Sequence, residues 1–174
     1  MESWKRKFAI IWTGQLFSIL SSAIVGYAVV FWISMETRSA EVLSLAVMAT
    51  LLPQALLGPL AGVYVDRWER KRTLIAADMF VAFCSLILGL LFYFGKAELG
   101  YIYLLLALRS VGSAFHSPAM QAAIPLLAPE TELMRISGVN QAIQSVCSIA
   151  GPALGALFIT SFTVSYTHLT LPTI

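Results

Sequence analysis

The sequence predicts an all-α membrane protein with about five membrane-spanning helices. Apolar residues make up 59% of the 174 residues and charged residues 11%, and the mean hydropathy is +0.82. A soluble domain is about 45–50% apolar and about 25% charged, so this chain must expose much of its surface to lipid. The composition excludes a soluble enzyme and a disordered tail. The net charge of +2 is too small for a nucleic-acid-binding surface.

Each expected span is an apolar stretch of at least the roughly 20 residues that a helix needs to cross a bilayer. The first stretch contains no charged residue and the second none before Asp66. The third and fourth contain one each, Asp78 and Arg109, and the fifth none. Stretches of this length favour helices over the roughly 10-residue strands of a membrane barrel. The expected helices cover residues 8–34, 42–66, 73–95, 99–127 and 137–162.

The basic residues predict the orientation of these spans. If five spans alternate, eight basic residues lie on the side of the N-terminus and two on the opposite side. Because Lys and Arg collect in cytoplasmic links, we expect a cytoplasmic N-terminus. The eight are Lys5, Arg6, Lys7, Arg67, Arg70, Lys71, Arg72 and Arg135, and the two are Arg38 and Lys96.

Motifs for enzyme chemistry are missing from the sequence. It contains no HExxH zinc motif, no GxSxG nucleophile turn and no carboxylate pair at a workable spacing. Cys84 and Cys147 lie inside apolar stretches, which indicates small buried hydrophobic residues rather than disulfide partners or metal ligands. We therefore predict no catalytic residue, no metal and no cofactor.

The link after the second span carries a patterned set of charges. Gly62 permits close helix approach, and Asp66 can pair with Arg70 four residues later if the helix continues. Composition alone leaves open a loop that only sets topology. The spacing resembles the major facilitator signature Gly-x-x-x-Asp-Arg-x-Gly-Arg-Lys, with Glu69 in place of one glycine. The resemblance implies a conformational gate between two halves of a transporter, formed by Gly62, Asp66, Arg67, Arg70 and Lys71.

Arg109 is a lone charge near the middle of the fourth span, about ten residues and so about 15 Å from its start. A charge there costs several kcal/mol, so it normally faces the bundle interior and has a function. A structural arginine paired with backbone carbonyls or a carboxylate is the alternative. The surrounding sequence resembles the fourth-helix element of the same superfamily, which implies a role for Arg109 in proton coupling.

The fifth span is rich in small residues around a proline. Pro152 is expected to kink the helix, and small residues beside it permit close helix packing. An ordinary membrane-helix kink is the alternative. The spacing of Gly138, Gly151, Pro152 and Gly155 resembles the antiporter signature of drug-exporting facilitators, with Cys147 and Ala156 replacing two glycines. The resemblance implies export.

Several polar residues inside the spans suggest a cavity. Asp78 lies about 8 Å deep in the third span, where a pair with Arg70, Arg72 or a helix N-terminus competes with substrate or proton binding. His116 is expected to be neutral and hydrogen-bonded, with a proton relay as the alternative. The remaining polar residues can line a cavity or join helices. They are Gln15, Gln121, Asn140, Gln141 and Gln144.

The resemblance covers residues 7–162, and Gly14–Gln15 with Ser117–Ala119 is similar to the macrolide-efflux-like drug exporters. Such proteins have two six-helix halves with substrate bound between them. The resemblance therefore implies about five helices of an incomplete N-terminal half, inactive without the missing C-terminal half. It further implies proton-coupled export of drug-like small molecules by alternating access in a bacterial plasma membrane. The implied partners are the lipid bilayer, the substrate and protons.

Two other functions stay open on the same residues. Uptake or lipid transport is possible on the same scaffold, and a small oligomeric channel or scaffold is a further alternative. The tail, residues 164–174, has a separate interpretation. Its first ten residues match the in-frame translation of a transposase-type sequencing adapter, so residues 1–163 are expected to be native and the tail non-native. A natural extracytoplasmic segment is the alternative.

Overall fold

The computed structural model describes the backbone of residues 2–127 and 129–169. The described residues form α-helices and a short 3-10 turn, without a strand, which confirms the expected all-α fold. The helices are α1 (Glu2–Thr37), α2 (Ala40–Arg67), α3 (Arg70–Tyr93), α4 (Leu99–Leu127) and α5 (Leu133–Leu169), with the turn η1 (Glu130–Glu132) before α5. Of the tail proposed to be non-native, 170–174 lie outside the described residues, and the backbone of 164–169 continues α5.

The helices extend beyond the apolar stretches that predict them. The N-terminal helix begins at Glu2 rather than near residue 8, and the last begins at Leu133 rather than near 137. Apolarity marks the part of a helix that suits the membrane, whereas backbone hydrogen bonds continue through polar flanks. The links are correspondingly short. Trp68 and Glu69 take extended backbone angles between α2 and α3, and Gly95 takes a φ of +66° just after α3.

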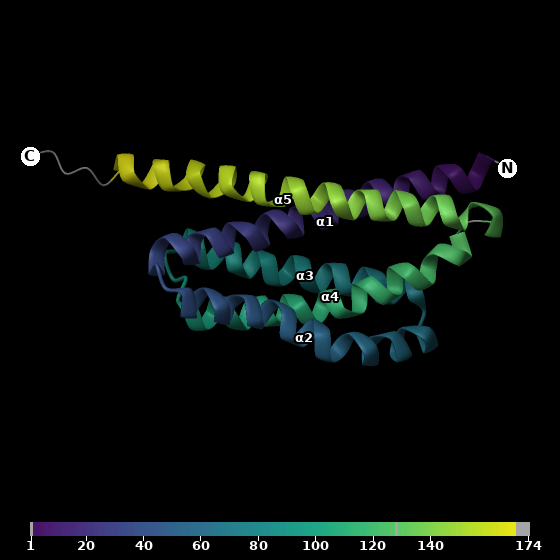
Figure 1. Ribbon diagram of the computed structural model, residues 1–174, viewed down its shortest axis with the longest axis horizontal. Coiled ribbons are helices and arrows are strands. Elements are labelled where there is room, and N and C mark those ends of the chain that lie inside the picture. The colour runs from purple at the N-terminus through teal and green to yellow at the C-terminus, as the bar shows by residue number, and fades with distance from the viewer. Residues whose placement is uncertain (1, 128, 170–174) are drawn as a thin grey trace, which may run out of the picture.

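Successive helices run antiparallel, and they pair in a defined order (Figure 1). The most extensive contacts join α2 to α4, α1 to α5 and α3 to α4. Figure 1 places the N-terminal end of α1, the α2–α3 link and the α4–α5 link at one end of the bundle. The α1–α2 and α3–α4 links lie at the other end. The basic residues of the α2–α3 link therefore lie at the same end as the N-terminal end of α1.

Four helical segments of the described chain are long and apolar enough to cross a membrane. They are Phe8–Thr37, Ala40–Arg67, Arg70–Tyr93 and Glu130–Thr160. Helix α4 is not among them although it has 29 residues. It carries Arg109 and His116, whose polarity lowers its hydropathy. Helix α4 also makes extensive contacts with both α2 and α3.

Two apolar clusters hold the bundle together at its two ends. One is centred on buried residues of α1, α3 and α4, including Ile33, Leu88 and Ile102. The other joins α1, α4 and α5 through buried Trp12 and Ile136. Large apolar side chains elsewhere remain exposed, as lipid-facing residues must be. Buried Cys84 belongs to the first cluster, and Cys147 is also buried, so both thiols behave as the expected small hydrophobic residues.

Candidate functional site

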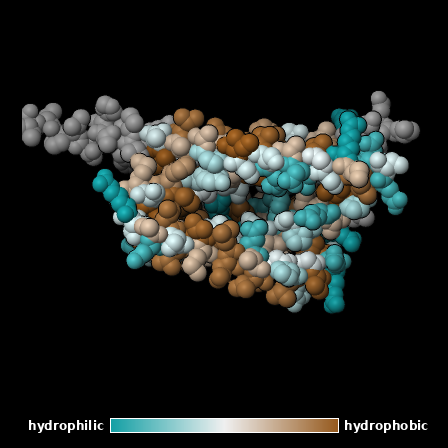
Figure 2. All heavy atoms as spheres, in the orientation of Figure 1, coloured by the Kyte–Doolittle hydropathy of each residue, from teal (hydrophilic) through white to brown (hydrophobic). Residues whose placement is uncertain are grey.

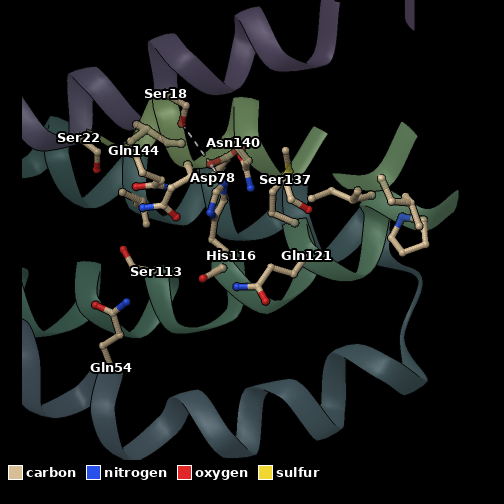
Figure 3. Close-up of a pocket in the computed structure, with 18 residues that line it drawn as sticks. Ser18, Ser22, Gln54, Asp78, Ser113, His116, Gln121, Ser137, Asn140 and Gln144 are labelled. Carbon is tan, nitrogen blue, oxygen red and sulfur yellow. Dashed lines mark hydrogen bonds and ion pairs between the residues drawn. The ribbon is translucent and has the colours of Figure 1, made fainter. Parts of the chain in front are cut away.

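A polar cavity of about 760 Å³ lies among the helices, with Met120 and Ile124 of the second apolar cluster in its lining. Figure 2 shows a hollow with hydrophilic residues around it, between apolar surfaces above and below. All five helices contribute side chains, and Figure 3 shows several of them around the shared space. The polar lining residues are Ser18, Ser22, Gln54, Asp78, Ser113, His116, Ser117, Gln121, Ser137, Asn140, Gln141 and Gln144. The sequence left open whether its polar residues line a cavity or join helices. Four of them line the cavity: Gln121, Asn140, Gln141 and Gln144.

The lining is polar but carries little charge. Asp78 is the one carboxylate among the lining residues, His116 is the one imidazole, and none of them is Lys or Arg. No cluster of three metal-binding side chains occurs in the part of the chain that the structure describes. The cavity is thus suited to solutes recognised by hydroxyl and amide groups around a single carboxylate.

Asp78 is held by side chains from two other helices. Its Oδ1 accepts a hydrogen bond from Ser18 Oγ at 3.2 Å and lies 3.3 Å from His116 Nε2. Its Oδ2 accepts from Gln15 Nε2 at 3.3 Å. The other end of the Gln15 amide closes the group, because its Oε1 lies 2.9 Å from His116 Nε2. Gln15 and His116 therefore belong to one network with Asp78.

The expected pair of Asp78 with Arg70 or Arg72 is wrong. Helix α3 begins at Arg70, so Asp78 lies eight residues and about 12 Å further along the helix axis. Arg72 instead pairs with Glu69 at 2.6 Å, where both side chains are exposed to solvent. The depth of Asp78 directs it to the interior partners on α1 and α4 rather than to the basic link.

Arg109 is buried, with 7% of its surface exposed. Its Nη2 donates to the backbone carbonyl of Ser22 at 2.9 Å and to Ser22 Oγ at 3.0 Å. Its Nε is buried and has no hydrogen-bond partner among the described residues. The guanidinium thus ties α4 to the middle of α1, which is the backbone-carbonyl pairing considered as one alternative. Its role in proton coupling stays a prediction.

Ser110, next to Arg109, contacts the backbone of α2 beside Pro53, an interaction that the sequence did not predict. Pro53 has no N–H, so the hydrogen-bond ladder of α2 is interrupted there. The Ser110 hydroxyl donates to the Thr50 carbonyl and accepts from the Gln54 N–H at 3.1 Å. It therefore bridges the Gln54 N–H and the Thr50 carbonyl, in the turn of α2 that the Pro53 ring disturbs. A proline inside a span is the sequence signal that a side chain from another helix is needed there.

The charged link between α2 and α3 does not contain the expected Asp66–Arg70 pair. The i, i+4 geometry is lost because α2 ends at Arg67 and the chain is extended at the next two residues. No ion pair joins Asp66 to Arg70 in the structure as described. Arg70 Nε is buried without a hydrogen-bond partner among the described residues. An added Cβ at Gly62 would meet nothing within 4 Å among the described residues, so the close approach that this glycine permits stays a prediction.

An aromatic contact holds this link against the bundle. The Trp68 ring stacks on Phe115 of α4, with centroids 6.4 Å apart and an interplanar angle of 11°. Tyr64 adds a tilted ring contact to Trp68 at 5.8 Å. Asp66, Arg67 and Lys71 remain exposed around this anchor. The structure therefore brings the candidate gate residues to one end of the bundle, with their charges available to another surface.

The glycines of α5 lie at a tight contact with α1. A Cβ at Gly155 would stand 2.9 Å from Tyr27 Cβ and 3.1 Å from the Ala28 nitrogen. A Cβ at Gly151 would stand 3.0 Å from Ala23 Cβ. These positions confirm the expected close packing. Gly138 differs, because nothing lies within 4 Å of a Cβ added there.

A bundle of long apolar helices around a polar cavity defines a multi-pass membrane protein of the transporter class. The chain belongs to the Major Facilitator Superfamily, whose family model matches residues 11–172. This family is one of transporters rather than enzymes. The sequence-based assignment to the superfamily is therefore confirmed.

Several of the similar bacterial proteins are named for efflux or export. Macrolide efflux protein A of Streptococcus pyogenes is 41% identical over 156 residues, which are 90% of this chain and 38% of that protein. Macrolide efflux protein A of Enterococcus faecalis is 40% identical over 119 residues, 68% of this chain and 36% of that protein. The enterobactin exporter EntS of Shigella boydii is 26% identical over 163 residues, 92% of this chain and 39% of that protein.

These matches confirm the resemblance to macrolide-efflux-like exporters. The chain spans less than two fifths of the length of each of these three relatives. No solved structure matches the chain.

Proposed function

We propose that this chain is the N-terminal part of a proton-coupled secondary transporter that exports drug-like small molecules by alternating access. The polar cavity among apolar helices is the observation that carries the proposal, because a solute crossing the bilayer needs such a polar path. The names of the similar bacterial exporters support the direction of transport. Hydroxyl and amide groups around one carboxylate suit a polar solute of low charge.

Three parts of the chain have separate roles in this proposal. Arg109 couples proton occupancy to the helix positions, since it ties α4 to α1 at Ser22. The link residues Asp66, Arg67, Arg70 and Lys71, with Gly62, act as a gate against the other half. Arg70 Nε, which has no partner within the described part of the chain, supports this role, because a buried donor is satisfied only when an acceptor reaches it.

The glycine-rich face of α5 has the third role. Gly151, Pro152 and Gly155 keep α5 tight against α1, and Gly138 lies nearer the N-terminal end of the same helix. A tight α1–α5 contact prevents solute and ions from leaking past the cavity. We propose that the chain alone does not transport, because the second wall of the cavity comes from the C-terminal half. The N-terminus is proposed to face the cytoplasm, with the link after α2 on the same side.

The test measures export by the complete transporter expressed from the source DNA in a bacterium that lacks its own drug exporters. A radiolabelled macrolide is the probe, because two relatives are named for that class. Cells with the transporter should accumulate less macrolide than cells with an empty vector, and a protonophore should abolish the difference. Glu36→Gln, an exposed change in the last turn of α1, is the matched control and should export normally.

Two outcomes would count against the proposal. Greater accumulation with the transporter would favour uptake on the same scaffold. Export that persists when the protonophore has collapsed the gradient would remove proton coupling.

A further inference from the structure

We propose that Asp78 and His116 together form a proton-binding site in the wall of the cavity, with His116 Nδ1 as the atom that takes up the proton. The inference rests on the proposed function, because it names where the coupled proton is held. It assigns the exchangeable proton to this pair rather than to Arg109. A guanidinium stays protonated in proteins and so is unsuited to release a proton in each cycle.

The hydrogen-bond network fixes the tautomer of His116. A carboxylate only accepts hydrogen bonds, so the amide nitrogen of Gln15 must face Asp78 Oδ2. The amide oxygen of Gln15 then faces His116 Nε2 at 2.9 Å. Asp78 Oδ1 is the second acceptor near the same nitrogen, at 3.3 Å. Because both neighbours are acceptors, Nε2 carries the hydrogen, and Nδ1 is the nitrogen left to accept a proton.

The second ring nitrogen is open to a proton from the cavity. His116 lines the cavity, and Nδ1 has no hydrogen-bond partner among the described residues. A proton that binds to Nδ1 makes an imidazolium whose Nε2–H stays between Gln15 and Asp78. The bound state is thus an ion pair in which no existing hydrogen bond has to break.

The other helices around this pair offer it no competing base. From α1 it faces Gln15 and Ser18, and the polar residues of α2 and α5 that line the cavity are neutral amides and a serine. Arg109 precedes His116 by two turns of α4 and carries a fixed positive charge. The buried thiols Cys84, which follows Asp78 on α3, and Cys147 on α5 are further titratable groups in the bundle.

Proton binding therefore makes the net charge of these interior groups positive. Asp78 and Arg109 carry −1 and +1, so the sum is 0 when His116 is neutral and +1 when it is protonated. A positive interior repels a cationic solute in a medium of low dielectric constant. A proton entering from the outside then favours release of such a solute. This exchange at one shared site gives a physical basis for opposite movement of proton and substrate.

Nuclear magnetic resonance of the purified 174-residue chain in detergent tests the site directly. The chain contains two histidines and two aspartates, so labelled imidazole nitrogens and aspartate carboxyl carbons give few signals. His116→Gln assigns the histidine signals. At alkaline pH we expect His116 as the Nε2–H tautomer, and on acidification we expect the proton at Nδ1 while the Asp78 carboxylate stays ionised.

Substituting the carboxylate tests the pairing. In Asp78→Asn, the His116 titration should move to lower pH by about one unit or more, because the stabilising charge is lost. Glu98→Gln removes an exposed carboxylate just before α4 and should leave the titration unchanged. An Nδ1–H tautomer at alkaline pH, a proton that goes to Asp78 instead, or an unchanged titration in a folded Asp78→Asn chain would each overturn the site.

The wild-type measurements stand even if Asp78→Asn fails to fold. They are also independent of transport. A protein that shows the expected titration but exports nothing would contradict the proposed function and leave the proton site intact. A protein that exports with the gradient while His116 never titrates would contradict the site alone.

Discussion

Gly155 of α5 lies directly against Tyr27 of α1, so close that a Cβ at position 155 would stand 2.9 Å from Tyr27 Cβ. Real carbon atoms do not approach so closely without displacement. Two neighbouring atoms of the α1 backbone, the Ala28 nitrogen and the Ile24 oxygen, lie within 3.2 Å of the same point. Backbone atoms cannot rotate away as a side chain can. A residue larger than glycine at position 155 would therefore push α1 and α5 apart.

We therefore predict that Gly155→Leu destabilises the chain. Overpacking a tight contact costs about 1–3 kcal/mol, and the α1–α5 pair must separate to admit the side chain. Unfolding of the purified chain in detergent, followed by tryptophan fluorescence, measures the loss. Gly138→Leu is the matched control on the same helix, since a Cβ there meets nothing within 4 Å. Equal loss in both variants would contradict the assigned contact.

The Ser110 hydroxyl should be worth more than an ordinary serine in a membrane helix. Ser110→Ala leaves the Gln54 N–H and the Thr50 carbonyl of α2 without their bridge. We expect a loss of about 0.6–2 kcal/mol, the range for hydrogen bonds between membrane helices, and faster amide exchange at Gln54. Ser85→Ala is the matched control, because that hydroxyl bonds only within its own helix.

A double substitution tests why Ser110 is needed. Pro53→Ala restores the N–H that faces the Ala49 carbonyl and removes the ring that displaces the preceding turn of α2, so Gln54 can approach Thr50 with less help from α4. Ser110→Ala should therefore cost less in the Pro53→Ala background than in the wild type. The same cost in both backgrounds would show that the hydroxyl acts independently of the proline.

The sequence predicts the helices well and their rotations poorly. Long apolar stretches specify which residues are helical, because each must cross a layer of fixed thickness. The partner of Asp78 depends on how α1, α3 and α4 face one another, and Gln15 lies 63 residues away from it along the chain. Sequence proximity therefore favoured the basic link at Arg72, whereas packing places the carboxylate beside His116.

Helix rotation also decides which of the motif glycines make close contacts. Gly155 and Gly62 both stand in signatures that resemble superfamily motifs, but in the described structure one lies against α1 and the other faces open space. Gly112 of α4 shows the reverse case, since it is not among the predicted motif residues, yet a Cβ there would stand 2.7 Å from Val81 of α3. Motif spacing indicates which residues matter, and helix rotation decides which of them make contact.

Arg109 should matter for transport more than for stability. A buried charge carries a large desolvation cost, and Arg109→Leu removes this cost together with the two hydrogen bonds to Ser22, so the two effects oppose each other. Arg109→Leu is therefore expected to fold and insert while the complete transporter loses macrolide export. Accumulation of radiolabelled macrolide measures the loss, with membrane quantity checked by immunoblot. Arg109→Leu cells that still export under a proton gradient would exclude Arg109 from coupling.

The proposed orientation can be tested with single cysteines. Both native cysteines are buried, so after their replacement by alanine a membrane-impermeant maleimide labels only an introduced thiol. Ser39→Cys in the α1–α2 link should be labelled on intact cells, because the proposal places this link outside. Lys71→Cys, near the start of α3, should be labelled only after the cells are permeabilised.

Glu98→Cys and Glu132→Cys repeat the comparison at the α3–α4 link and the turn before α5. They lie at opposite ends of the bundle, so they should follow Ser39 and Lys71 respectively. The opposite pattern at all four positions would invert the orientation and contradict the assignment from basic residues. Labelling of Ser39 and Lys71 from the same side would instead mean that α2 does not cross the membrane.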